Sequence, residues 1–172
     1  MTMDCESAKV DVSDHGISMS SSGPADYAES ERSIRGFVEI VEAAGYPATL
    51  FLHPEVAIAH ADLVREMHAS GTCLGLHLHP YKLADSGYTQ DLGAYPEDQQ
   101  RGILKRAIEA WENALGERPQ YFRAGYFSAN DCTFRILEEL GFRGGSLSSP
   151  GRLLPSHFSV WRDAVPYPHR AH

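Results

Sequence analysis

Four side chains that can bind a metal ion occur as two closely spaced pairs in this sequence. His77 and His79 form a His-x-His pair, and Asp4 and Glu6 form an acidic pair near the start of the chain. Residues i and i+2 of an extended strand point to the same face, so each pair can direct two ligand-type side chains into one cavity. The two pairs therefore indicate a metal site at the ends of two strands.

A His-x-His pair alone is weak evidence, because the chain contains nine His. The alternative is that the two His are polar loop residues or hydrogen-bonded core residues. Other polar residues also follow predicted strands: His53 follows 48–52, and Arg123 and Tyr126 lie at the end of 120–123. Ligands of parallel α/β folds bind at the carboxyl ends of the strands, so this convergence favours a functional site.

The composition is that of one globular domain spanning residues 1–172. The chain is 42% hydrophobic and 22% charged, with a net charge of −8 and no cluster of Lys and Arg, so we expect no nucleic-acid partner. No apolar run approaches the roughly 20 residues of a membrane span. The three cysteines, Cys5, Cys73 and Cys132, form no CxxC pair, which favours a reducing compartment and a cytoplasmic location.

Helical and strand patterns alternate along the chain. Apolar periodicity predicts helices over 26–44, 56–70, 96–115 and 130–140, each followed by a glycine. Apolar runs predict strands over 1–3, 48–52, 73–76, 120–123 and 142–147, with loops over 8–24 and 85–95. The alternation predicts an α/β fold with parallel strands and right-handed crossovers, in an open sheet or most of a barrel.

Several of these segments resemble, in order, the motif blocks of the polysaccharide deacetylase family, carbohydrate esterase family four. The blocks are 2–6, 48–52, 75–79, 122–126 and 137–142, and the resemblance spans about residues 1–149. It implies a distorted parallel-strand (β/α) barrel, a divalent metal held by one carboxylate and two His, and hydrolysis of an N-acetyl group from an amino sugar.

The resemblance also implies roles for single residues. By motif, Asp4 matches the general base, His77 the first His ligand, Arg123 the arginine that orients the base, and Tyr126 the residue whose backbone N–H helps to bind the oxyanion. These roles suit amide hydrolysis, which needs an activated water, a group that accepts its proton, and donors that stabilise the tetrahedral oxyanion.

The sequence departs from the family pattern at the acidic motif. Cys5 stands where the family has a second, metal-binding Asp, and Glu6 follows one position later. We expect Glu6 to be the ligand and Asp4 the base, with exchanged roles as the alternative. Cys5 is expected to point away from both acids, into the packing layer.

A second departure concerns the second His ligand. The family places it four residues after the first, where this chain has Tyr81, and we assign the role to His79 instead. The expected metal ligands are therefore Glu6, His77 and His79. His and carboxylate ligands with an open position suit Zn²⁺ best, although Fe, Co and Ni use the same donors.

Three further assignments concern substrate contact. His157 has the Leu-x-x-His spacing of the family's late catalytic motif, within a segment that is otherwise predicted as loop. His53 and Tyr81 lie at predicted strand ends and are assigned to substrate binding, with a hydrogen-bonded structural His as the alternative for His53. Loop aromatic residues such as Tyr81 are suited to stacking on sugar rings.

The predicted function is a metal-dependent hydrolase that removes an N-acyl (acetyl) group from an amino sugar or polysaccharide. One alternative is an amide hydrolase of the same fold acting on a non-glycan small molecule, and another is a non-catalytic sugar-binding member. A third is a fragment whose barrel lacks the strands that follow Leu147 in the family. The sequence does not indicate an oligomeric state.

Overall fold

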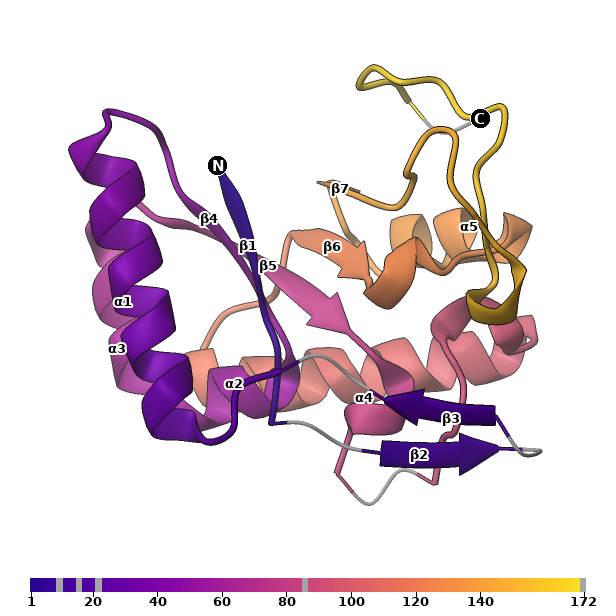
Figure 1. The fold of residues 1–172 in the computed structure, drawn as a ribbon, viewed down its shortest axis with the longest axis horizontal. Helices are drawn as coiled ribbons and strands as arrows, with labels where there is room; N and C mark the ends of the chain where they lie inside the picture. The colour runs from indigo at the N-terminus through magenta and orange to yellow at the C-terminus, as the bar shows by residue number, and fades with distance from the viewer. Residues whose placement is uncertain (9–10, 15–16, 21–22, 85–86, 171–172) are drawn as a thin grey trace.

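A five-stranded, wholly parallel sheet forms the centre of the computed structural model, which describes residues 1–8, 11–14, 17–20, 23–84 and 87–170 (Figure 1). The strand order in the sheet is β1-β4-β5-β6-β7. The strands are β1 (Thr2–Cys5), β4 (Thr49–Leu52), β5 (Cys73–Leu78), β6 (Tyr121–Ala124) and β7 (Gly144–Gly145). The predicted α/β fold with parallel strands is thereby confirmed.

The central strands turn an apolar face toward the helices. Leu50, Leu52 and Leu76 share this face by register, have no exposed surface and belong to the same core cluster as the buried helix residues. The covering helices are α1 (Tyr27–Ala43), α2 (Pro54–Ala59), α3 (Ala61–Ala69), α4 (Glu97–Leu115) and α5 (Asp131–Glu139). Helix α4 packs against α2, α3 and α5, and it carries the fully buried Ile103 and Leu104.

The sheet is open over the described residues. Strands β1 and β7 are its two edges, and neither has a second neighbour in the sheet. The arrangement is consistent with a (β/α) barrel that does not close, which agrees with the predicted distorted and incomplete barrel. The described residues also form four short 3₁₀ turns, η1 (Pro80–Lys82), η2 (Leu92–Ala94), η3 (Gly125–Phe127) and η4 (Pro155–His157).

The single helix predicted over 56–70 is wrong, because two helices occupy this segment. Pro54 begins α2 at the first helical position, with His53 as its N-cap. His60 then leaves the helical region, with φ −120° and ψ 30°, and α3 begins at Ala61. Periodicity alone did not show this break, since the apolar stripe continues on both sides of His60.

Two other segments differ from the sequence-based expectation. Part of the loop predicted over 8–24 forms an antiparallel hairpin of β2 (Asp11–Asp14) and β3 (Ile17–Ser20). The strand predicted over 142–147 is reduced to Gly144–Gly145, which pairs with β6. Farther along the chain, β8 (Leu153–Leu154) pairs antiparallel with β9 (Ser159–Val160), and η4 connects the two strands.

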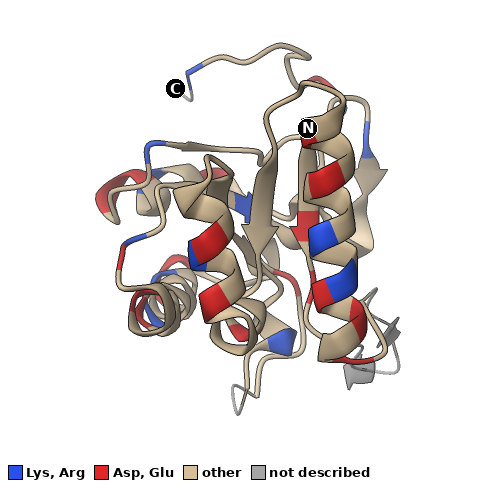
Figure 2. Ribbon diagram, turned by 90° about the vertical axis from the view of Figure 1, so that its left-hand side faces the viewer, with Lys and Arg blue, Asp and Glu red and all other residues tan. Residues whose placement is uncertain are grey.

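Charged residues of both signs are distributed over the helices. Figure 2 shows Lys and Arg interspersed with Asp and Glu, without a basic cluster among the described residues on this side. Among the described residues, no helix is both long enough and apolar enough to cross a membrane.

Candidate metal centre

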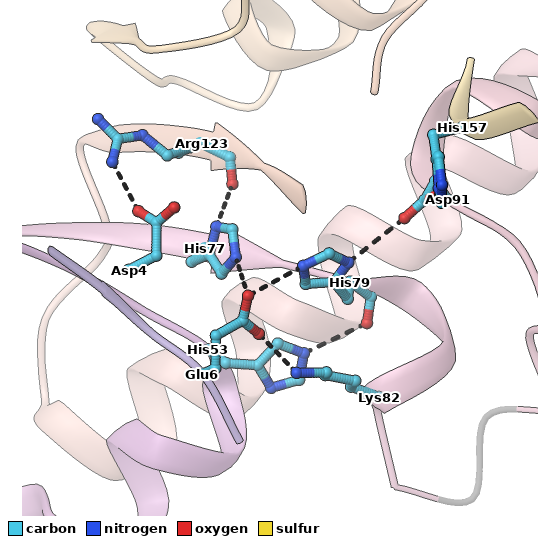
Figure 3. Close-up of polar contacts among 9 residues, drawn as sticks. All are labelled: Asp4, Glu6, His53, His77, His79, Lys82, Asp91, Arg123 and His157. Carbon is cyan, nitrogen blue, oxygen red and sulfur yellow. Dashed lines mark hydrogen bonds and ion pairs between the residues drawn. The ribbon is translucent and has the colours of Figure 1, made fainter. Parts of the chain in front are cut away.

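Three ligand-type side chains converge where β1 and β5 end. Glu6 directly follows β1, His77 lies within β5, and His79 directly follows β5. Glu6 Oε1 lies 3.1 Å from Nε2 of His77 and 3.1 Å from Nε2 of His79. Figure 3 shows both imidazoles directed at this one carboxylate oxygen. The structure therefore brings together the three residues that the sequence analysis assigned to the metal.

The donor set fits a divalent metal ion. One donor atom from each residue lies within 4.8 Å of the other two. Ligands about 2.0–2.1 Å from a tetrahedral Zn²⁺ are themselves about 3.3 Å apart, close to the observed spacing. Nδ1 of His77 donates to the Arg123 carbonyl oxygen at 3.0 Å, and Nδ1 of His79 lies 3.3 Å from Asp91 Oδ1. Such partners leave Nε2 of each ring as the ligand atom.

The electrostatics keep Glu6 ionised. Burial by itself raises the pKa of Glu6, but hydrogen bonds and charges from His77 and His79 outweigh it and hold this pKa well below its usual range. Burial lowers the pKa of His79, yet its contacts with Asp91 and Glu6 raise it overall. At neutral pH the site therefore contains a carboxylate that can act as a ligand.

Lys82 is a site residue that the sequence analysis missed. Its Nζ donates to Glu6 Oε2 at 2.6 Å, and its side chain has no exposed surface. Burial lowers the pKa of Lys82, while Glu6 opposes that shift. One carboxylate oxygen of Glu6 thus contacts the two imidazoles, and the other accepts a hydrogen bond from the ammonium of Lys82.

Gly125 makes room for the His79 ring. A Cβ at position 125 would lie 2.2 Å from Cε1 and from Nδ1 of His79, closer than any real Cβ contact. Gly125 begins η3, directly after β6. The close approach of β6 to the ring therefore requires a residue without a side chain.

Asp4 pairs with Arg123 on the neighbouring part of the site. Arg123 Nη1 donates to Asp4 Oδ1 at 2.6 Å, and the side chain of Asp4 is 36% exposed. The guanidinium lies 4.1 Å from the centre of the Phe51 ring, which fits because Gly75 has no Cβ to meet that ring. Arg123 was matched by motif to the arginine that orients the base, and in the structure its partner is Asp4.

The buried Cys5 lies between the two acids in the sequence. It is 2% exposed, and burial, followed by the charges of Asp4 and Glu6, raises the pKa of its thiol. This agrees with the expectation that Cys5 points into the packing layer, where it acts as a small apolar side chain.

Asp91 links His79 to the late segment of the chain. It is almost completely buried, and its Oδ2 accepts a hydrogen bond from Nδ1 of His157 at 2.8 Å. The His157 ring lies 4.1 Å from the ring of Tyr126, which in turn meets the edge of His79 at 5.3 Å. His157 and Tyr126 are thus both brought to the site.

Asp91 was not predicted, because a single acid in a polar loop carries no signal of its own.

The turn that holds Tyr126 is conformationally unusual. Tyr126 and Phe127 have φ values of 52° and 57°, in the left-handed region that non-glycine residues rarely adopt. Such backbone conformations persist where the surrounding structure enforces them, and they are common at functional sites.

His53 serves as a structural link. It has no exposed surface; its Nδ1 accepts from the Glu55 N–H at 3.5 Å, and its Nε2 donates to the His79 carbonyl at 3.2 Å. Burial lowers the pKa of His53 to about 3, so the ring stays neutral. This geometry leaves no surface for a substrate and fits the alternative, a hydrogen-bonded structural His.

Tyr81 packs beside His79, with 5.2 Å between the ring centres. It is 6% exposed, and its hydroxyl has no hydrogen-bond partner among the described residues. Burial raises the pKa of this phenol, which therefore remains a donor. Its assignment to substrate binding stays a prediction.

The open parallel sheet with its covering helices is consistent with a (β/α)-barrel fold, and Glu6, His77 and His79 at its strand ends are a group that could hold a metal ion. The family model described as polysaccharide deacetylase matches residues 23–145, more than half of the chain. The chain therefore belongs to the polysaccharide deacetylase family, as predicted. The match begins after Glu6, so Asp4 and Glu6 lie outside it.

Seventeen chains of solved structures match this chain significantly. A protein of Mycobacterium smegmatis assigned to the polysaccharide deacetylases is 30% identical, with a TM-score of 0.52, over 64% of this chain and 36% of its own. Puue allantoinase is 23% identical, with a TM-score of 0.53, over 78% and 43%.

A further match is a pseudoenzyme of carbohydrate esterase family four from Bacillus anthracis. It is 15% identical, with a TM-score of 0.53, over 67% of this chain and 38% of its own. This chain thus spans about two fifths of the length of the three structures described. The comparison with curated proteins finds no significant match.

Proposed function

We propose that this protein is a metal-dependent hydrolase that removes an N-acyl group, such as acetyl, from an amino sugar or polysaccharide. The observation that carries the proposal is the convergence of Glu6 Oε1 on Nε2 of His77 and of His79, at 3.1 Å each, within a fold of this family. Three protein ligands with an open position suit a catalytic Zn²⁺. The metal, when bound, polarises the amide carbonyl and lowers the proton affinity of water.

Asp4 is the proposed general base. Its carboxylate is partly exposed, so it can reach a water molecule, whereas the carboxylate of Glu6 is engaged by the two His and by Lys82. Arg123 donates to Asp4 Oδ1 and orients this carboxylate, whose other oxygen would accept the proton of the attacking water. In this proposal Glu6 is the ligand and Asp4 the base.

His157 is the proposed proton donor to the leaving amine. Cleavage of the C–N bond leaves an amine that must gain a proton. Nδ1 of His157 donates to the buried Asp91, which directs Nε2 away from Asp91, and the side chain is 22% exposed. The backbone N–H of Tyr126, in the left-handed turn after β6, is the proposed donor to the oxyanion.

The decisive variant is Asp4→Asn, which keeps the shape of the side chain and removes the base. We expect release of acetate from N-acetylated sugar oligomers to fall about 10²- to 10⁴-fold. Metal content, measured by elemental mass spectrometry, should stay that of the parent. Asp62→Asn, at an exposed position on α3, is the matched control and should behave as the parent. Parental turnover in Asp4→Asn would remove Asp4 from the base role.

The second candidate function is sugar binding without catalysis. It is favoured by Cys5 and Tyr81, which stand where the family has metal ligands, and a family relative from Bacillus anthracis is a pseudoenzyme. A non-catalytic protein would bind N-acetylated sugars equally well with Asp4→Asn, and its parent form would release no acetate. Hydrolysis of a non-glycan amide would appear as turnover of small non-glycan amides without release of acetate from N-acetylated sugars. The cytoplasmic location stays a prediction.

A further inference from the structure

A buried lysine lies against the proposed metal ligands. The side chain of Lys82 has no exposed surface, and its Nζ is 2.6 Å from Glu6 Oε2. Lysine is almost never fully buried unless it is paired, because its ammonium is expensive to remove from water. The pairing with Glu6 therefore holds a positive charge inside the site.

The position of Lys82 is fixed by the same turn that follows the His pair. Lys82 ends η1, three residues after His79, and its backbone N–H donates to the His79 carbonyl at 2.9 Å. Its ammonium thus approaches the carboxylate from the β5 side and takes Oε2, while both imidazoles face Oε1 (Figure 3). The two oxygens of one carboxylate serve two different positive partners.

These contacts have opposite consequences for the metal-free and metal-bound protein. Without a metal, the ammonium compensates the buried carboxylate of Glu6 and stabilises the folded chain. A divalent cation held by Glu6, His77 and His79 would have the Lys82 ammonium as a like charge on the same carboxylate, in buried surroundings of low dielectric constant. The hydrogen bond from the ammonium also draws electron density from the Glu6 carboxylate, which makes this carboxylate a weaker metal ligand.

We propose that Lys82 is a counter-cation that stabilises the metal-free site and thereby weakens the binding of a divalent metal. The proposal rests on the proposed function only in taking Glu6, His77 and His79 as the metal ligands. By linkage, a group that stabilises the metal-free form more than the bound form lowers metal affinity by the corresponding factor. One substitution should therefore change stability and metal affinity in opposite directions.

The test compares the full chain with Lys82→Met, Lys82→Gln and the control Lys105→Met, an exposed position on α4. Zn²⁺ affinity is measured by competition with a chromophoric chelator, and melting temperature is measured in excess EDTA. We expect both Lys82 variants to bind Zn²⁺ at least about tenfold more tightly and to melt at lower temperature without metal. Lys105→Met should match the parent in both measurements.

Lys82→Gln separates charge from orientation, because its amide can still donate to Glu6 Oε2 but carries no charge. If Lys82→Met does not fold, Lys82→Gln still allows Zn²⁺ affinity and melting temperature to be measured. Equal or weaker Zn²⁺ binding by both Lys82 variants, beside a parent that binds Zn²⁺, overturns the counter-cation and leaves the proposed function standing. Absence of Zn²⁺ and Co²⁺ binding in parent and variants overturns the metal centre itself. Binding in the variants but not in the parent supports the proposal in its strongest form.

Discussion

Gly125→Ala tests whether the position of His79 depends on the missing side chain at the end of β6. The added Cβ would lie 2.2 Å from Cε1 and Nδ1 of the His79 ring, whereas unbonded heavy atoms prefer separations of about 3.5–4.0 Å. The ring must therefore move by more than about 1 Å from the position in which it contacts Glu6 and Asp91. Gly125 is outside the left-handed region, so the effect comes from the Cβ and not from backbone strain.

The expected magnitude follows from two separate losses. Overpacking of a buried site costs about 1–3 kcal/mol of unfolding free energy, measured by urea denaturation in EDTA. Displacement of His79 from Glu6 and Asp91 should weaken Zn²⁺ binding by at least about 10- to 100-fold, the range found when the support of a ligand is removed. Both effects have the same sign, in contrast to those expected for Lys82.

Gly102→Ala is the matched control for this experiment. Gly102 lies in α4, and a Cβ there would meet nothing within 4 Å. Alanine in a helix is about 0.5–1 kcal/mol more favourable than glycine, so Gly102→Ala should be more stable than the parent, with unchanged Zn²⁺ binding. If Gly125→Ala kept the parental stability and Zn²⁺ affinity, the inferred contact between β6 and His79 would be refuted.

Three further variants give distinct outcomes. Asp91→Asn should weaken Zn²⁺ binding about 10- to 100-fold in chelator competition, because Asp91 supports His79, and unchanged affinity would contradict that support. The pKa of His53 is lowered from its unfolded value of about 6.5 to about 3, so the unfolded chain takes up the proton first. The contribution of neutral His53 to the free energy of unfolding should thus be fully present above about pH 6.5 and decline by up to about 1.4 kcal/mol per pH unit toward pH 3. In urea denaturation with EDTA, His53→Gln should reduce this dependence of stability on pH. An equal pH dependence in His53→Gln and the parent would contradict the assignment of a buried, neutral His53. Asp26→Ala removes the side chain that accepts from the Glu29 N–H at the start of α1, and urea denaturation should show a loss of about 1 kcal/mol with Zn²⁺ binding intact.

The boundaries of α4 and α5 were predictable because their signals are local. The helix predicted over 96–115 is α4, Glu97–Leu115, and it ends at Gly116 with φ of 78°. The helix predicted over 130–140 is α5, which begins after Asn130 in a capping box. Side-chain caps and left-handed glycines act within one turn of the chain, so one sequence is enough to place them.

The departures from prediction arise where packing between distant parts of the chain determines the backbone conformation. The break at His60 and the short β7 depend on how α2, α3 and β6 pack, which periodicity does not encode. Gly145, for example, lies so close to β6 that a Cβ would be 2.4 Å from the Phe122 carbonyl oxygen. Such close approaches become visible only once the sheet is assembled.

The candidate site was predictable to the extent that it follows strand geometry. The i, i+2 spacing of His77 and His79 placed both rings on one face, and the acidic pair supplied Glu6. Lys82 and Asp91 come from the loop after β5, where no pattern indicates which side chains turn inward. Their contacts depend on the path of that loop, and a single sequence leaves the path undetermined.

The contacts of Glu6 with side chains at the end of β5 and in η1 have a consequence for the order of folding. The contacts of Glu6 with His77, His79 and Lys82 join residues 71, 73 and 76 positions apart, so they form only after a large loop has closed. Local helices such as α4 form without waiting for that closure. During refolding, helical circular dichroism should therefore recover before the capacity to take up Zn²⁺, which makes metal uptake a reporter of the final assembly of the sheet.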